Sequence, residues 1–147
     1  MTKTSLHSSI AFVLILASTL MANAQSGGRL AVTVGGARND DGSIRCGLYN
    51  SPNGFREPGR EFKGAVARVR NGQGTCVFSG IPPGTYAVAV FHAEQNETRM
   101  ETGMFGKPKQ GYGFSRNPSS TFGPPGFDSA AFDYQGGNQN LSVQLNY

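Results

Sequence analysis

The sequence predicts an all-β protein, specifically an Ig-like or transthyretin-like antiparallel β-sandwich of about seven strands. Short segments recur in which apolar and polar residues alternate, and turns rich in Gly, Pro and Asn separate them at regular spacing. No helix of consequence is indicated. The 21 Gly and 8 Pro residues follow no period, which excludes a collagen-like chain.

Residues 1–24 have the form of a secretory signal peptide. Lys3 provides a positive start, residues 10–20 form an apolar run, and Ala22-Asn23-Ala24 is a small-x-small cleavage site. The run is shorter than the roughly 20 residues that span a bilayer. We therefore expect cleavage after Ala24, export to the periplasm or the medium, and a single β-sandwich domain over residues 25–147.

The chain expected after cleavage is mildly basic. One of the 13 Lys and Arg residues is Lys3, so 12 remain against nine Asp and Glu, for a net charge of about +3. The basic residues are scattered rather than grouped beside aromatic side chains, so no nucleic-acid partner is expected. A glycan, the cell wall or an envelope protein remains as a possible class of partner.

The first four strands are expected at residues 30–34, 43–50, 65–70 and 75–79. Asp41-Gly42 and Asn71-Gly72 are dipeptides typical of hairpin turns, so the strands on either side of each are expected to pair. Residues 55–64 are irregular and charged, which predicts an exposed connection, and residues 65–70 are expected to form an edge strand.

Residues 80–94 are expected to contain the central strand. A Pro82-Pro83-Gly84 turn leads into the longest β-prone segment of the exported chain. Its two alternating sets of side chains are both apolar, as in a strand that is covered on both faces. Two more strands are expected at residues 130–134 and 141–147, the last of them amphipathic.

The two cysteines are predicted to point into the same interior. Cys46 shares a strand face with Ile44 and Leu48, and Cys76 shares one with Phe78. An oxidising compartment then favours a disulfide between residues 30 positions apart. Two buried free thiols are the alternative. A metal or redox site has no neighbouring His or Cys to support it.

Residues 93–129 show no strand or helix pattern, and Gly and Pro recur through them. Ordinary connections have about 4–6 residues, so a long segment rich in Phe and Tyr is expected to be ordered and is the best candidate for function. One interpretation is a platform for a sugar ring, a peptide or a hydrophobic partner, formed by Tyr112, Phe114, Phe122 and Phe127 with Arg116 and Lys109 at its rim. The interpretation that we favour is that these rings fold back over the open side of the sandwich and complete its core.

His92 is the candidate for chemistry, at the exit of the central strand and beside Glu94. It is the one histidine of residues 25–147. Its ordinary interpretation is a hydrogen-bonded residue that closes one end of the core. Ser115 lies outside any Gly-x-Ser-x-Gly elbow, and nothing in the sequence activates it. No enzyme is expected.

Four segments carry a family resemblance. Residues 36–42 read Gly-Ala-Arg-Asn-x-x-Gly, and residues 80–92 read Gly-Ile-Pro-Pro-Gly-Thr-Tyr-Ala-Val-Ala-Val-Phe-His. Residues 106–115 read Gly-Lys-Pro-Lys-Gln-Gly-Tyr-Gly-Phe-Ser, and residues 122–132 read Phe-Gly-Pro-Pro-Gly-Phe-Asp-Ser-Ala-Ala-Phe. In this order they resemble the family catalogued as domain of unknown function 2141. The resemblance implies a small exported bacterial protein with one sandwich domain, and it implies no activity.

The resemblance also implies a loop similar to a calcium loop, Asp-x-Asn-x-Asn-Gly, after the His of the central strand. Here Ala93 and Gln95 replace its first acidic position and its next Asn position. The candidate metal ligands that remain are Glu94, Asn96, Glu97 and Glu101. Ca²⁺ takes about six to eight oxygens, more than these residues supply without backbone and water, so a solvated loop is expected and calcium is the alternative.

These observations together predict an exported, non-enzymatic module that binds a ligand or has a structural role in the envelope. A carbohydrate-binding or cell-wall-binding domain that uses the aromatic loop 105–127 is the first alternative. An enzyme centred on a metal or on His92 is the second.

Overall fold

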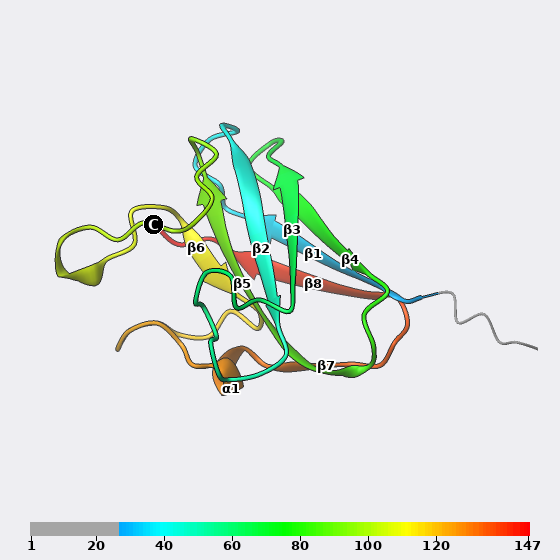
Figure 1. Cartoon of the computed structure of the whole chain (residues 1–147). Helices are drawn as coiled ribbons and strands as arrows, with labels where there is room; N and C mark the ends of the chain where they lie inside the picture. Colours follow the sequence, from blue (N-terminus) through cyan, green and yellow to red (C-terminus); the bar gives the residue numbers. More distant parts are fainter. Residues whose placement is uncertain (1–26) are drawn as a thin grey trace, which may run out of the picture.

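A computed structural model describes residues 27–147, and the expected signal peptide lies outside these residues (Figure 1). The described part contains the strands β1 (Arg29–Gly35), β2 (Ser43–Tyr49), β3 (Lys63–Arg68), β4 (Gly74–Ser79), β5 (Gly84–Ala93), β6 (Tyr112–Phe114), β7 (Phe132–Tyr134) and β8 (Gln139–Gln144). A 3-10 turn, η1 (Met104–Gly106), and a single helical turn, α1 (Phe127–Ala130), are its other elements. The all-β prediction is confirmed. Within residues 27–147, no helix has the length and apolar character needed to cross a membrane.

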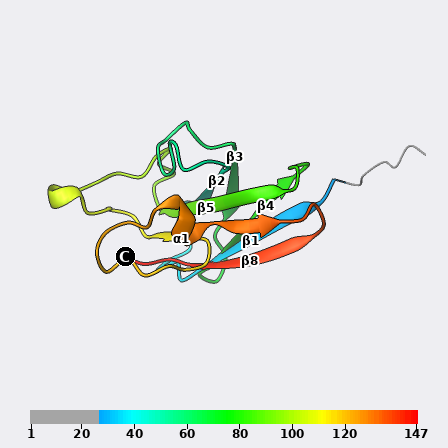
Figure 2. The same ribbon diagram turned by 90° about the horizontal axis from the view of Figure 1, so that it is seen from below.

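The strands form two layers. One sheet has the order β4-β1-β8, and the other has the order β3-β2-β5-β6, with β7 paired to the start of β5. In Figure 2, β5 lies above β1 and β8. All pairs are antiparallel except β1 and β8, which run parallel with Leu30 opposite Gln139 and Gly35 opposite Gln144. The sandwich prediction is confirmed, with this parallel pair as the departure from an antiparallel fold.

β5 is the central strand, as predicted. It pairs with β2 along Ala87–Ala93, with β6 at Ala89–Phe91, and with β7 at Gly84–Tyr86. Its inner face, with Tyr86, Val88 and Val90, is buried in the core between the sheets. Its outer face is covered too, because Ala87 belongs to a second apolar cluster. The inner face of this strand is therefore buried, and its apolar outer face is buried at Ala87 and half-buried at Ala89 and Phe91.

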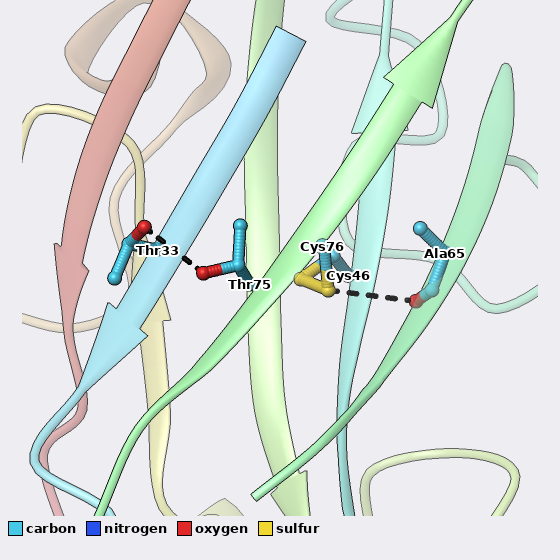
Figure 3. Close-up of a disulfide and its surroundings, with 5 residues drawn as sticks. All are labelled: Thr33, Cys46, Ala65, Thr75 and Cys76. Carbon is cyan, nitrogen blue, oxygen red and sulfur yellow. Dashed lines mark hydrogen bonds between the residues drawn. A yellow bond between two sulfur atoms is a disulfide. The ribbon is translucent and has the colours of Figure 1, made fainter. Parts of the chain in front are cut away.

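The Cys46–Cys76 disulfide joins the two sheets through the core (Figure 3). Cys46 lies on β2 and Cys76 on β4, with their Cα atoms 6.4 Å apart. The Sγ atom of Cys76 also lies 3.8 Å from the carbonyl oxygen of Ala65 on β3. The predicted disulfide is confirmed, and the alternative of two free thiols is wrong.

The second cluster forms on the outer face of the five-stranded sheet, where two loops fold over it. Its members are Tyr49, Phe55, Ala87, Phe114, Phe127 and Ala130. The Phe55 ring lies at its centre, 5.2 Å from the Tyr49 ring, 6.0 Å from the Phe114 ring and 5.7 Å from the Phe127 ring. The prediction that the connection 55–64 is exposed is therefore wrong at Phe55, because this ring packs on the sheet.

The hairpin predicted across Asp41-Gly42 is wrong, since β1 and β2 lie in different sheets. The carboxylate of Asp40 instead accepts hydrogen bonds from the backbone N–H groups of Asn71 and Gly72, at 2.9 and 2.8 Å. The Asn71-Gly72 turn itself forms, with paired backbone bonds between Arg70 and Gln73. β3 and β4 then diverge into separate sheets. Alternation along a strand predicts which of its faces is buried. It does not predict the sheet to which the strand belongs, because two strands in facing sheets show the same alternation as two strands that pair.

The prediction that residues 93–129 contain no strand or helix is also wrong, because β6, η1 and α1 lie there. These elements have three or four residues each, too short for a sequence period. Side chain–backbone bonds tie the segment to the sandwich. Ser115 Oγ accepts the Val88 N–H at 2.9 Å and donates to the Ala130 carbonyl at 2.5 Å. The Asn117 amide pairs with the edge of β8, at Ser142 O and Gln144 N.

Candidate functional site

His92 closes one end of the core and is fully buried. Its Nε2 lies 2.8 Å from the Asp41 carbonyl oxygen, and its Nδ1 lies 2.6 Å from Tyr147 Oη. Because a carbonyl only accepts, Nε2 carries a proton and donates to it. In the neutral ring, Nδ1 then accepts from Tyr147, whose Oη accepts in turn from the Arg38 N–H at 3.1 Å. Both ring nitrogens are thus engaged inside the protein.

Glu94 lies outside this buried network, in an ion pair on the surface. Arg38 donates to its carboxylate through Nε at 2.7 Å and Nη2 at 2.5 Å, and Asn39 Nδ2 donates at 2.6 Å. The Arg38 guanidinium also lies over the Tyr147 ring, 4.7 Å from its centroid. The hydrogen bond from Arg38 is the main reason that the pKa of Glu94 lies below its ordinary value of 4.5.

The lowered pKa of Glu94 predicts a contribution to stability that disappears in acid. A carboxyl whose pKa is lower in the folded state stabilises the fold above its ordinary pKa of 4.5, and this stabilisation is lost as the pH falls through the folded value. Denaturant unfolding at a series of pH values below 5 should show a smaller acid loss for Glu94→Gln than for the wild type. Equal losses would contradict the assigned role of the ion pair.

The four candidate metal ligands do not converge. The Glu94 carboxylate is held by Arg38, while that of Glu97 accepts from the Gln95 N–H and from Gln110 Nε2. Glu101 forms an ion pair with Lys109 at 3.4 Å. Asn96 has a left-handed backbone, with φ at 59°, in the turn that follows β5. Among residues 27–147, no three His, Cys, Asp or Glu side chains form a group suited to a metal ion.

This arrangement does not fit a calcium loop, because its carboxylates have separate partners. Adding CaCl₂ to the chelator-treated protein should therefore leave the melting temperature unchanged. A ligand that binds only the native state raises this temperature by mass action, so a calcium-dependent rise would show that a site assembles here.

Tyr112 and Phe114 lie on the outer face of β6, with their ring centroids 5.9 Å apart. Phe114 is buried in the second cluster, and Tyr112 is half-buried at its edge. Arg116 is exposed, and its Nη1 donates to the Ala131 carbonyl at 3.2 Å. The favoured cover therefore forms at Phe114 and at Phe127, which are buried in this cluster, whereas Phe122 is fully exposed. Tyr112 remains partly open to solvent, whereas Arg116 holds the loop in place.

A groove of about 560 Å³ crosses the outer face of the sheet β3-β2-β5-β6, and we call it the outer groove. The strand register explains it. Gly64, Gly47, Ala89 and Phe114 form one row across the four strands, and Val66, Arg45, Phe91 and Tyr112 form the next. The first row has three small residues. The Tyr49 ring covers Gly47, 2.9 Å from the position of an added Cβ, whereas Gly64 and Ala89 leave a trough beside the larger side chains. Three other parts of the chain border the groove: the connection that contains Arg56 and Glu61, the segment 98–108, and Pro124.

Arg45 is the distinctive polar residue of the outer groove. It lies between Val66 on β3 and Phe91 on β5, so its neighbours across the sheet are apolar. Its Nε is buried and has no hydrogen-bond partner among the described residues. A buried donor without a partner is unfavourable unless a ligand or water satisfies it. Arg56 and Arg99 also line the groove, with Glu61 as the one acidic side chain among its lining residues.

A second hollow, of about 410 Å³, lies where β6 meets the end of β8, and we call it the polar hollow. Tyr112 and Phe114 separate the two hollows, since they line both. Uncharged side chains make up the rest of the polar hollow, namely Asn117, Pro118, Ser119, Ser120, Thr121, Gln144 and Asn146.

Of the predicted site residues, the structure thus brings Tyr112 and Phe114 to both hollows. It places His92 in the core, Glu94 in the Arg38 ion pair and Arg116 on the cover. The sequence interpretation missed Arg45 and the row of small residues. The available signal for Arg45 was its position within the apolar alternation of residues 43–50. The row of small residues becomes apparent only when the register of the four strands is known.

Comparisons with known proteins agree with the sequence motifs. A family model described as "Uncharacterized protein conserved in bacteria (DUF2141)" matches residues 32–142, which include β2 to β7, most of β1 and β8, and every residue that lines the outer groove. A search of curated proteins and a search of solved structures each found no match. Because the matched span covers most of the sequence, the chain belongs to this family of uncharacterised bacterial proteins.

Proposed function

We propose that the protein is an exported, non-catalytic binding module and that its ligand occupies the outer groove. The observation that carries the proposal is the groove itself, an apolar trough lined by Arg45, whose buried Nε has no hydrogen-bond partner among the described residues. Ligand sites are typically apolar clefts of this size with a few polar groups that orient the ligand. The signal-peptide pattern and the disulfide support export, because disulfides persist in oxidising compartments.

The ligand class follows from the lining. Phe91 and Tyr112 offer ring surfaces, and the small residues Gly64 and Ala89 leave room beside them for an apolar body. Arg45, Arg56 and Arg99 outnumber Glu61, which favours a negative group on the ligand. An amphipathic anion, with an apolar body and a carboxylate, phosphate or sulfonate, fits both properties.

The same geometry argues against catalysis by the groups that the sequence singled out. The ring nitrogens of His92 are bonded to Asp41 and Tyr147, and Ser115 Oγ is bonded to Val88 and Ala130. Each of these side chains is fully buried. A nucleophile or general base has to reach a substrate, and these two groups face the protein interior.

A fluorescent probe tests the proposal. Anilinonaphthalene sulfonate has an aromatic body and a sulfonate, and we expect it to bind the folded protein and to be displaced by dodecanoate. Gly64→Leu should abolish this binding, because Gly64 lines the groove and a Cβ added there meets no atom within 4 Å, so the Leu side chain has room to occupy the space of the ligand. Arg45→Met should weaken it by about tenfold or more, because a hydrogen bond to a charged group contributes about 1.5–3 kcal/mol.

Gly137→Leu is the matched control for this experiment. Gly137 also has nothing within 4 Å of an added Cβ, and it does not line the outer groove. This variant should bind the probe as the wild type does, and all three variants should unfold cooperatively on heating. Equal binding by Gly64→Leu and the wild type would overturn the proposal, and so would a wild type that binds neither the probe nor dodecanoate.

A second candidate function is binding of a neutral saccharide in the polar hollow. Sugar recognition uses amide and hydroxyl groups beside an aromatic ring, and the hollow combines these with Tyr112 and without a charged side chain. A thermal-shift screen of neutral glycans and cell-wall fragments tests this candidate. A glycan that stabilises both the wild type and Gly64→Leu would assign binding to the polar hollow, and a screen without stabilisation would remove the candidate.

A further inference from the structure

Three apolar side chains stand at the tips of two projecting loops. Met104 is 83 % exposed and Phe105 95 % exposed at η1, and Phe122 is fully exposed in the loop between β6 and α1. They are the three most exposed large apolar residues of the described chain. Figures 1 and 2 both show the η1 arm and the loop before α1 projecting from the same end of the sandwich.

The arm that carries η1 has an ordered backbone. The Gly103 N–H donates to the Lys107 carbonyl at 2.7 Å, and the Lys109 N–H donates to the Glu101 carbonyl at 2.9 Å. Phe105 has a φ of 61°, in the left-handed region that residues with a Cβ rarely adopt. The arm is thus a short ladder that holds a bulky aromatic side chain away from the protein surface.

All charged residues in the same part of the chain are basic. Residues 102–127 contain Lys107, Lys109 and Arg116 and no Asp or Glu, so they carry a charge of +3. This equals the net charge expected for the whole of residues 25–147. Lys109 forms an ion pair with Glu101, which precedes this segment, whereas Lys107 forms no salt bridge with a described residue.

From these features we propose that the η1 arm and the loop 119–126 dock the protein reversibly onto an anionic lipid bilayer. Separate convex tips do not suit a single pocket of a protein partner, whereas the headgroup region accepts individual apolar side chains. Anionic headgroups attract Lys and Arg near the surface, which matches the charge of the segment. The proposal goes beyond ligand binding in the outer groove and does not depend on it.

Co-sedimentation with vesicles tests the docking. The protein comprising residues 25–147 should sediment with vesicles of phosphatidylethanolamine and phosphatidylglycerol, and less with vesicles of phosphatidylcholine alone. The double variant Phe105→Ser with Phe122→Ser should bind anionic vesicles about tenfold or more weakly than the wild type, because neither loop then has a Phe ring to insert into the bilayer. Lys107→Gln should weaken binding to anionic vesicles and leave binding to phosphatidylcholine unchanged.

Phe62→Ser is the matched control, since Phe62 is an exposed ring immediately before β3 and outside both loops. It should sediment as the wild type does, and thermal unfolding should show that each variant is folded. A wild type that does not sediment with anionic vesicles would overturn the proposal. Loss of binding in Lys107→Gln alone, with the double Phe variant unaffected, would also overturn it, because binding would then be purely electrostatic.

Discussion

Replacing both cysteines, as Cys46→Ala with Cys76→Ala, is expected to lower the free energy of unfolding by about 3–4 kcal/mol. The bond closes a chain segment of 30 residues and ties β2 in one sheet to β4 in the other. Without it, the unfolded chain gains conformational freedom that the folded chain does not. Urea denaturation of the wild type and the double variant, extrapolated to water, measures the difference.

A reducing agent provides the control for this variant. It should destabilise the wild type by a similar amount and have no effect on the double variant, since the variant has no bond to reduce. A loss below about 1 kcal/mol would place the double variant in the range of an ordinary substitution and would contradict the role assigned to the bond.

Phe55→Ala is expected to lower the free energy of unfolding by about 3 kcal/mol or more, within the range observed for buried Phe residues. Phe55 is only 7 % exposed and packs against Tyr49, Phe114 and Phe127, so its removal leaves a cavity among three rings. Equilibrium urea denaturation again measures the effect. The result tests whether the loops over the outer face form a true second core.

Phe62→Ala in the same connection is the comparison for Phe55→Ala. Phe62 is 45 % exposed, and its one aromatic neighbour is Tyr86, at a centroid distance of 6.0 Å. Its removal should therefore have an effect of about 1 kcal/mol or less. Similar losses for the two variants would contradict a second core centred on Phe55.

The burial of each strand face could be predicted from the sequence, because a strand alternates with a period of two. This rule placed Cys46 and Cys76 in one interior, and the disulfide follows from their shared face. It also predicted that β5 is covered on both faces, since its side chains are apolar on both. Local alternation is thus sufficient to assign the core positions on the long strands, whereas Phe55 and Phe127 of the second cluster lie outside the strands and follow no such pattern.

The assignment of strands to sheets could not be predicted in the same way. Two strands that face each other across a core show the same alternation as two strands that pair. The bonds from Asp40 to Asn71 and Gly72 help to hold the connection between β1 and β2 at the end of the sandwich, and no local pattern reveals them. The parallel pairing of β8 with β1 likewise depends on contacts between distant segments.

The candidate site, too, could be predicted from the sequence only in part. Tyr112 and Phe114 were predicted as site residues because aromatic side chains in a long loop are conspicuous. Arg45 and the trough beside it were missed, because Gly64, Gly47 and Ala89 become neighbours only through the register of three strands. His92 attracted attention as a chemically versatile residue, yet its hydrogen bonds assign it to the end of the core.

Amide chemical shifts during a titration of the ¹⁵N-labelled protein with dodecanoate test the central claim most directly. If the outer groove is the binding site, the amides of Arg45, Gly47, Gly64 and Ala89 should shift in a saturable manner. The amides around Gly137, at the far end of β7, should not move. Saturable shifts confined to residues outside the outer groove, or no shifts at all, would contradict the claim.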